Sequence, residues 1–280
     1  MNACVLFRTS REEELEQEFR ICSSYLPTVA YRTAINPGSI VVGRYSVLPN
    51  FQELEEELLL NESVLVNNYE QHKYIADFEY YDDVKEFTPK TYFSWGDLPE
   101  GSYVVKGKTN SRKFLWNTHM FAKTKDDVPV VARRLLDDQF IEPQGLIVRE
   151  YIPLKQFDIG INEMPVTNEW RFFFFGTMCL AHGYYWANFP EVLDDRKAKC
   201  MGQMCNFAQD VANIISRKVN FFVLDVAEKK NGGYTLIEVN DGQCSGLSMC
   251  DPYRMYRNLN ISLLNCRISN AHGLACVINE

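Results

Sequence analysis

The sequence predicts an α/β protein in which a small doubly wound domain precedes a larger part with antiparallel sheets. Over roughly the first 70 residues, short apolar segments alternate with amphipathic ones, which is the order of a parallel sheet with helices on its faces. Farther along, two pairs of strand-like segments are each joined by a short turn that contains glycine, which indicates antiparallel hairpins. A chain of 280 residues is long enough for two domains or subdomains.

The N-terminal segment is predicted to run strand, helix, strand, helix, strand. Ser10 with Glu13, and Asn50 with Glu53, are residue pairs that typically cap the first turn of a helix. The strands expected here are residues 3–7, 40–43 and 64–66, and a helix follows each capping pair.

The rest of the chain is predicted to hold strands and helices in a less regular order. Residues 69–102 are rich in Tyr, Asp and Pro and show no regular pattern. The strands expected beyond them are residues 103–108, 146–152, 170–175, 178–186, 221–227 and 234–240. The helices expected are residues 126–140, residues 200–214 with apolar positions at steps of four and three, and the tail from about residue 253.

Composition and charge exclude several classes of protein. The net charge of −8 argues against a broad nucleic-acid-binding surface. There is no run of 18 apolar residues and no apolar signal-peptide core at the N-terminus, so we expect no membrane association and a cytoplasmic location.

The cysteines and histidines do not show the spacing of a metal site. The nine cysteines include no Cys-x-x-Cys pair, and the four histidines share no spacing typical of metal binding. Cys22 and Cys200 fall on apolar positions of predicted helices. We therefore expect reduced thiols in the core, histidines with structural roles and no structural zinc site.

A short hairpin would bring three oxygen-bearing side chains together. Asn231-Gly232 favours a two-residue type I′ turn, and with that turn the numbers of paired residues sum to 463. Asp225 then lies opposite Glu238, roughly 5 Å away, and Asn240 shares their face because side chains alternate along a strand. A divalent cation between the two carboxylates would relieve their repulsion, whereas a solvent-facing hairpin with scattered charges is the alternative. The opposite face is expected to be apolar and to carry Phe222, Leu224, Val226, Ile237 and Val239.

A group of cations is a candidate for phosphate binding. Lys106 and Lys108 are predicted on one face of their strand, and Arg112 and Lys113 follow in the next loop. Fixed positive charges of this kind bind phosphate, although a solvated loop fits the pattern equally well. The Gly-x-x-x-x-Gly-Lys pattern of a P-loop is absent.

Other charged residues stand inside apolar strands or at their ends. Arg171 shares a strand face with Glu169 in an aromatic run, so it needs a phosphate or carboxylate partner, and Glu169 or another acid could supply the latter. Arg149 and Glu150 lie within an apolar strand, which is either a hinge whose backbone binds an adenine edge or an edge strand with ion pairs. Arg44 ends a strand and is either a contact to an anionic substrate or a surface arginine.

This order of segments resembles the ATP-grasp superfamily. The series is a small α/β domain, a strand lysine, a hinge strand, a strand arginine, and then Asp and Glu-x-Asn on neighbouring strands. Asp225 with Glu238-x-Asn240 is the most specific part of a resemblance that covers roughly residues 40 to 250. Residues 43–49, 88–91, 105–107 and 149–151 look like the clade named for two arginines and one lysine, which includes bacterial and phage proteins.

The resemblance implies a role for each matching residue. Lys106, with the help of Lys108, would contact the phosphates of ATP, and which lysine is the main contact stays open. Arg149 would bind the nucleotide, and Glu150, Tyr151 and Ile152 would form the adenine hinge. Arg171 would hold a phosphate or acyl phosphate, so that Arg171 and Lys106 are the expected catalytic residues. Asp225, Glu238 and Asn240 would hold Mg²⁺, with Mn²⁺ as the alternative metal.

The resemblance also implies a reaction and a domain division. Superfamily members commonly activate a carboxylate as an acyl phosphate, which an amine then attacks. The expected function is thus an ATP- and Mg²⁺-dependent ligase acting on a small-molecule or peptide carboxylate and an amine, with no oligomeric state indicated. A phosphotransferase on this fold and a nucleotide-binding module without turnover stay as alternatives. The expected domains are residues 1–87 and an ATP-grasp domain at 88–280, made of subdomains 88–152 and 153–280.

Overall fold

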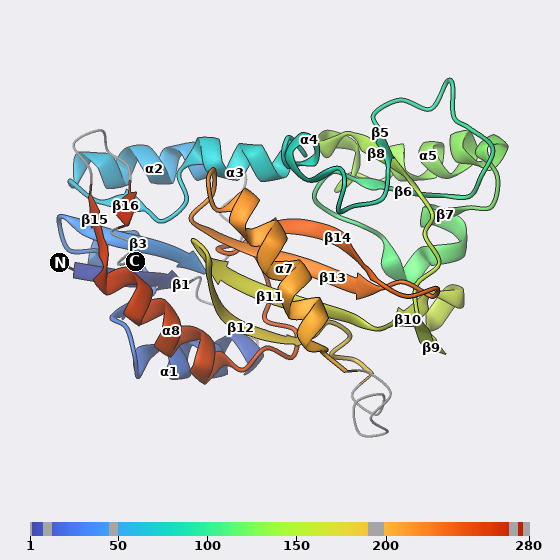
Figure 1. The fold of residues 1–280 in the computed structure, drawn as a ribbon. Helices are drawn as coiled ribbons and strands as arrows, with labels where there is room; N and C mark the ends of the chain where they lie inside the picture. Colours follow the sequence, from blue (N-terminus) through green and yellow to red (C-terminus); the bar gives the residue numbers. More distant parts are fainter. Residues whose placement is uncertain (1, 8–12, 45–49, 190–198, 269–273, 277–280) are drawn as a thin grey trace.

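A computed structural model of the protein, drawn in Figure 1, describes residues 2–7, 13–44, 50–189, 199–268 and 274–276. Three four-stranded sheets form its frame, with strand orders β2-β1-β3-β4, β5-β8-β6-β7 and β12-β11-β13-β14. In Figure 1 the first sheet lies at one end of the molecule, the second at the other end and the third between them. We call them the N-terminal, small and large sheets.

The N-terminal sheet is parallel and has helices on both faces. Along β1 the side chains alternate, so that Val5 packs in one core with α1 (Glu13–Ser23) and Leu6 packs in another with α2 (Phe51–Leu60). This is the predicted doubly wound arrangement, with one short strand, β2, that was not predicted. The strands are β1 (Asn2–Phe7), β2 (Thr28–Val29), β3 (Ser39–Arg44) and β4 (Val64–Leu65).

Only part of the predicted helix capping in this region can be compared with the structure. Helix α2 follows Asn50 as expected, but the Asn50 side chain makes no capping hydrogen bond. The predicted cap at Ser10 lies outside the described residues. Two further helices, α3 (Tyr69–Ala76) and α4 (Tyr80–Val84), lead from the N-terminal sheet toward the small sheet (Figure 1).

The small sheet is antiparallel and packs against α5 (Val128–Leu136). A π-helical turn, η3 (Trp116–Met120), follows β6 and precedes β7. The strands are β5 (Thr91–Tyr92), β6 (Tyr103–Gly107), β7 (Phe121–Ala122) and β8 (Leu146–Glu150). None of the helices in the described part of the chain is both long and apolar enough to cross a membrane.

The large sheet is antiparallel and separates two cores. On one face, Phe172 and Phe174 pack with α7 (Gly202–Ile215). On the other face, Phe173 and Phe175 join α8 (Pro252–Leu264) and the N-terminal sheet in a single core. The strands are β11 (Glu169–Phe175), β12 (Met178–Tyr184), β13 (Phe221–Glu228) and β14 (Tyr234–Asp241), and two small hairpins accompany them, β9 (Gln156–Ile159) with β10 (Pro165–Thr167) and β15 (Cys266–Ile268) with β16 (Leu274–Cys276).

The hairpin of β13 and β14 differs from the predicted one at its turn. Positive φ angles occur at Gly232 and Gly233, and the amide of Lys229 donates to the carbonyl of Gly233. The prediction of a two-residue turn at Asn231-Gly232 is therefore wrong. Near the turn, paired residue numbers sum to 462 (226 + 236), and a bulge beyond Asp225 restores the expected sum of 463. The same bulge moves Ile237 out of the apolar core and puts Leu236 there instead.

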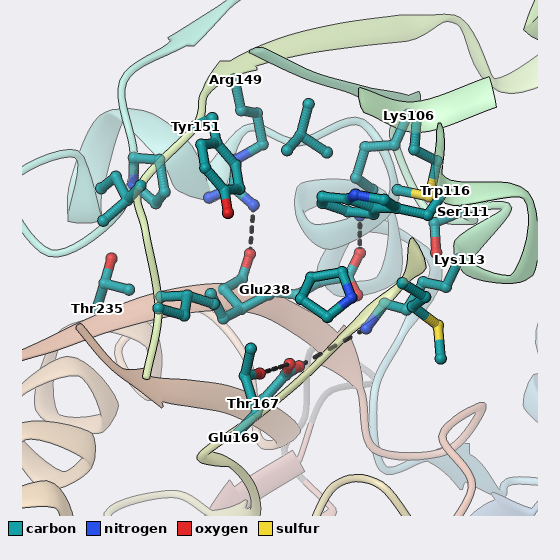
Figure 2. Close-up of a pocket in the computed structure, with 18 of the residues that line it drawn as sticks. Lys106, Ser111, Lys113, Trp116, Arg149, Tyr151, Thr167, Glu169, Thr235 and Glu238 are labelled. Carbon is teal, nitrogen blue, oxygen red and sulfur yellow. Dashed lines mark hydrogen bonds and ion pairs between the residues drawn. The ribbon is translucent and has the colours of Figure 1, made fainter. Parts of the chain in front are cut away.

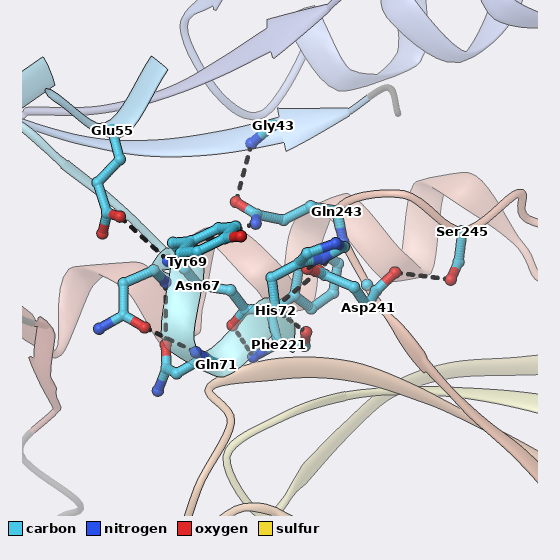
Figure 3. Close-up of polar contacts among 12 residues, drawn as sticks. Gly43, Glu55, Asn67, Tyr69, Gln71, His72, Phe221, Asp241, Gln243 and Ser245 are labelled. Carbon is cyan, nitrogen blue, oxygen red and sulfur yellow. Dashed lines mark hydrogen bonds and ion pairs between the residues drawn. The ribbon is translucent and has the colours of Figure 1, made fainter. Parts of the chain in front are cut away.

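A buried polar cluster joins the large sheet to the N-terminal sheet and α3 (Figure 3). Asp241, the last residue of β14, accepts a hydrogen bond from Asn67 Nδ2 at 2.8 Å, and its other oxygen lies 2.9 Å from Nδ1 of His72. Gln243 continues the cluster by accepting a bond from the amide of Gly43 on β3 at 3.2 Å. Because each partner is buried, these contacts hold one end of the large sheet in a fixed place.

Candidate active site

A pocket lies between the small sheet and the large sheet (Figure 2). From the small sheet, β6 and β8 contribute Lys106 and Arg149, and the segment Glu150-Tyr151-Ile152 follows directly. From the large sheet, β11 and β14 contribute Glu169 and Glu238. Lys106 and Glu238, which face each other from the two walls, are more than 130 residues apart in the sequence. The pocket therefore exists only in the folded chain.

The three side chains of the predicted metal group meet on one face of the large sheet. Asp225 pairs directly with Glu238 across β13 and β14, as the sequence predicted. Asn240 donates from Nδ2 to Oδ2 of Asp225 at 3.3 Å. Glu238 lines the pocket, and Asp225 lies fully buried behind it, so the group runs from the pocket wall into the sheet.

Arg171 and Asp225 form a buried, two-pronged ion pair between β11 and β13. Nε and Nη2 of Arg171 donate to the two carboxylate oxygens of Asp225 at 2.9 and 2.8 Å. The third guanidinium nitrogen donates to the carbonyl of Gly246 at 2.7 Å. Burial acts to lower the pKa of Arg171, but Asp225 outweighs it and the pKa is raised. The acid that pairs with Arg171 is therefore Asp225 and not the strand neighbour Glu169.

Lys106 crosses the pocket and forms an ion pair with Glu238 (Figure 2). Both side chains are largely buried, at 7% and 13% exposed. Burial acts to raise the pKa of Glu238, but Lys106 and, more remotely, Lys113 outweigh it, so the pKa of Glu238 is lowered. The carboxylate is thus ionised at neutral pH and joins the two walls electrostatically.

A second lysine enters the pocket from the loop after β6. Nζ of Lys113 lies 3.6 Å from Oε1 of Glu169 and donates to the hydroxyl of Tyr185 at 2.8 Å. It also lies 5.2 Å from the ring centre of Trp186, which is a cation–π distance. Burial raises the pKa of Glu169, with Asp225 adding to the effect and Lys113 opposing it.

The hinge strand β8 holds Arg149 and presents its last residues to the pocket. Arg149, labelled in Figure 2, is buried and donates to the carbonyl of Ile237 on β14. It also donates to Thr88 Oγ1. Glu150 accepts a bond from the hydroxyl of Tyr92 at 2.8 Å, and the amide of Tyr151 donates to Ser102. Within the described residues, the amide of Ile152 takes part in no hydrogen bond, so it is available to a ligand.

Two expected site residues lie elsewhere. Strand β6 ends at Gly107, so Lys108 leaves the strand and does not line the pocket that Lys106 lines. Arg44 is buried and pairs with Glu18 at 2.7 Å and with the carbonyls of Gly242 and Ser245. The prediction that Arg44 contacts an anionic substrate is therefore wrong, because its guanidinium is already used to join α1, β3 and the segment after β14.

Several residues that line the pocket have no assigned role in the predicted site. The sequence indicates Lys113 only as part of a cationic loop, and Glu169 only as a partner for Arg171. Trp116 of η3 and Trp186 form aromatic parts of the lining. No local spacing signal distinguishes these residues, because they meet the others only through tertiary packing.

The residues present fit a nucleotide with a divalent cation. Lys106, Lys113, Arg149 and Arg171 carry four positive charges against four negative charges on Glu150, Glu169, Asp225 and Glu238, which leaves a formal local charge of zero. Among the described residues, Glu169 Oε1 and Arg149 Nε are buried without a hydrogen-bond partner. Two carboxylates and an amide oxygen match the ligands that Mg²⁺ takes beside phosphate oxygens and water.

Comparisons with known proteins show which family model and which solved structures the chain resembles. The model of an ATP-grasp domain family, the third family of the clade named for two arginines and one lysine, matches residues 93–259. The crystal structure of the D-cycloserine synthetase DcsG is similar over 94% of this chain and 100% of that chain, with 11% identity and a TM-score of 0.60. No curated protein sequence matches the chain.

Two further solved structures show the same fold. The ATP-grasp ligase PsnB, complexed with a phosphomimetic variant of its minimal precursor, Mg and ADP, is similar over 94% of this chain and 97% of that chain, with 8% identity and a TM-score of 0.55. The D-alanyl-alanine synthetase A from Vibrio cholerae O1 biovar eltor is similar over 89% and 91%, with 12% identity and a TM-score of 0.52. At these identities the likeness concerns the fold.

Proposed function

The chain belongs to the ATP-grasp domain family, in the clade named for two arginines and one lysine, and from this premise we propose that it is an ADP-forming ligase that joins a carboxylate to an amine. The membership confirms the predicted superfamily, the α+β ATP-grasp fold, and ATP and Mg²⁺ as the cofactors of such ligases. The acyl donor, the amine and the roles of single residues are the subject of the proposal.

The observation that carries the proposal is the pairing of cations with acids at the pocket, once across it and once within the large sheet behind its wall. Lys106 from the small sheet meets Glu238 from the large sheet, and Arg171 meets Asp225 one strand farther in. A nucleotide seated between the sheets would place its phosphates among these four groups. Phosphoryl transfer needs mainly positioning and neutralisation of charge, and this site supplies both.

In our proposal, the hinge strand binds the base of the nucleotide and the buried cations bind its phosphates. The backbone of Glu150-Tyr151-Ile152 would bind the adenine edge, because the amide of Ile152 is free within the described residues. Lys106 and Arg171 would bind phosphoryl oxygens, and Arg149 would hold the hinge strand against β14 through the carbonyl of Ile237.

Asp225, Glu238 and Asn240 would hold Mg²⁺, which when bound neutralises phosphate charge. In the reaction, a carboxylate oxygen attacks the γ-phosphorus of ATP and the bond from the γ-phosphorus to ADP breaks, which gives an acyl phosphate and ADP. An amine then attacks the acyl carbon, loses a proton and displaces inorganic phosphate, which gives an amide. Enclosure of the first product between the two sheets would limit its hydrolysis by water.

The donor and acceptor are proposed by class only. PsnB has been solved with a precursor peptide, whereas the Vibrio cholerae protein is named for a dipeptide of alanine. Both kinds of substrate present a carboxylate and an amine. We therefore propose a small-molecule or peptide carboxylate as donor and a primary amine as acceptor.

The test is ADP release from Mg²⁺ and ATP across a panel of amino acids, hydroxy acids and peptide C-termini, with hydroxylamine as a general amine. A ligase should release ADP only with a suitable carboxylate and should form its hydroxamate. A phosphotransferase would release ADP without a hydroxamate, and a binding module would bind Mg·AMP-PNP in calorimetry without any ADP release. Either result would replace the ligase proposal.

A further inference from the structure

A group of sulfur and imidazole ligands lies on the face of the large sheet opposite the pocket. His182 of β12 pairs with Phe172, so it faces α7, whereas the neighbouring Arg171 faces the ion pairs. Cys200 lies just before α7, and Cys205 lies in its first turn. The Nδ1 or Nε2 atom of His182 and the two sulfurs all lie within 4.8 Å of one another.

A bulge in β12 adds a third cysteine to this face. Phe172 pairs with His182 and Phe174 pairs with Cys179, so the irregularity between Phe173 and Phe174 puts Cys179 and His182 on the same side of the strand although they are three residues apart. Cys179 packs in the same core as Cys200 and Cys205, although its sulfur is outside the group of three ligand atoms that lie within 4.8 Å of one another. The chain thus brings a Cys-x-x-His pair and a Cys-x-x-x-x-Cys pair together.

The distances suit a metal better than a disulfide. The sulfurs of Cys200 and Cys205 are 3.4 Å apart. Tetrahedral Zn–S bonds of roughly 2.3 Å would place two sulfurs roughly 3.8 Å apart, whereas a disulfide requires about 2.05 Å. The ring of His182 is stacked on Phe172, with ring centres 5.4 Å apart, which fixes the orientation of the imidazole.

The surroundings also suit a zinc–thiolate centre. Three thiolates and Zn²⁺ carry a net charge of −1, and the positive charge of Arg254, which acts on both Cys179 and His182, offsets it.

We propose that His182, Cys200, Cys205 and Cys179 bind a structural Zn²⁺ ion that fastens the start of α7 to β12. The spacing of the two cysteines at the start of α7 is close to that of structural zinc sites. This site is independent of the pocket, because none of its four residues lines the pocket. The expectation of free core thiols at Cys200 would then not hold.

The test measures metal in the full-length protein, purified without a histidine tag under reducing conditions. Elemental analysis should find about one zinc per chain. After removal of zinc and addition of Co²⁺, the spectrum should show a sulfur-to-cobalt charge-transfer band together with the d–d bands of tetrahedral Co²⁺. Because this spectrum comes from the wild-type chain, it does not depend on whether a variant folds.

Matched variants locate the metal. Cys205→Ser and His182→Ala should each weaken zinc binding by more than about 100-fold, since changes merely behind the ligands cost 10- to 100-fold. Cys179→Ser should lower the charge-transfer intensity. The control is Cys244→Ser, because Cys244 belongs to the other grouping of potential ligands in the described chain, with His72 and Asp241, and it should leave the zinc content unchanged.

Three outcomes would overturn the proposal. One is a wild-type cobalt spectrum without the sulfur band. Another is zinc that stays bound in Cys205→Ser or is lost in Cys244→Ser. The third is a Cys200–Cys205 disulfide in the purified protein, detected by alkylation and mass spectrometry.

Discussion

The ion pair of Arg171 and Asp225 gives a prediction whose size follows from its geometry. Its side chains are 11% and 0% exposed, and two hydrogen bonds of 2.9 and 2.8 Å join them. Solvent screening is therefore small, and removing one partner leaves the other charge buried. We expect Asp225→Asn to destabilise the ligand-free protein by about 3–5 kcal/mol.

The reverse change should cost a similar amount, and the two together should cost less than their sum. Arg171→Gln leaves the Asp225 carboxylate buried, whereas Arg171→Gln with Asp225→Asn leaves two neutral amide groups. The double variant should regain about 2–3 kcal/mol relative to additivity. Urea unfolding of all four proteins closes this cycle, and thermal unfolding should show Asp225→Asn lower in Tm by about 6–20 °C.

The coupling energy between Arg171 and Asp225 decides whether this reasoning holds. If the coupling energy is below about 0.5 kcal/mol, the two side chains do not form the buried pair described above. AMP-PNP added without Mg²⁺ should partly rescue Asp225→Asn if phosphate oxygens can replace the lost carboxylate at Arg171. A nucleotide that stabilises wild type and variant equally would argue against contact between Arg171 and phosphate.

Three further changes test other parts of the structure. Lys106→Met should weaken Mg·AMP-PNP binding by roughly 10- to 150-fold, the equivalent of a hydrogen bond to a charged group. Lys108→Met, outside the pocket, should change the affinity less than about threefold. Equal effects of the two variants in calorimetry would contradict the assignment of Lys106 as the phosphate contact. Because the pKa of Glu238 is lowered from 4.5, its carboxylate stabilises the fold above that pH, and this stabilisation is lost as pH falls through the folded-state pKa. The difference in stability between wild type and Glu238→Gln should therefore be constant above about pH 5 and shrink below 4.5. A difference that is independent of pH in urea titrations would contradict this. A Cβ at Gly183 would meet backbone atoms 2.2 Å away, whereas one at Gly202 meets nothing within 4 Å. Gly183→Ala should therefore lower the free energy of unfolding by about 1–3 kcal/mol or more, and Gly202→Ala should leave thermal stability unchanged or raise it. A stable Gly183→Ala protein would show that β12 and the segment before α8 lie farther apart.

The sequence predicted the hairpin residues well although it predicted the turn wrongly. The turn between β13 and β14 holds one residue more than expected, and the bulge beyond Asp225 compensates for it. Asp225 therefore still faces Glu238. Turn type and bulges depend on how the strands pack, so the pattern of side chains alone could not show that these two changes cancel.

The position of the cations shows where local reasoning stops. Alternation along a strand predicted one face for Lys106 and Lys108, but β6 ends between them at Gly107. Arg44 does stand at the end of a strand, yet Glu18 of α1 lies within 2.7 Å and takes up its charge. The end of a strand and the nearest buried acid are both set by contacts between segments distant in sequence.

The residues of the second proposed site were also hidden by local pattern. Cys179 and His182 would face opposite sides of a regular strand, since side chains alternate. The bulge in β12 reverses that expectation, and α7 brings Cys200 and Cys205 to the same place. Neither the bulge nor the docking of the helix has a signal in the spacing of cysteines.

The two ion pairs of the site make the binding of metal and the binding of nucleotide interdependent. Lys106 is held by Glu238 and Arg171 by Asp225, so each group proposed for phosphate now neutralises a group proposed for the cation. A lone polyphosphate would strand two carboxylates without a counter-charge, and a lone divalent ion would strand two cationic side chains. Each species should therefore raise the affinity for the other by the same factor, as reciprocal linkage demands. In the protein without ligand, the two internal ion pairs compete with either component alone, so the site should favour the complete metal–nucleotide complex over either component.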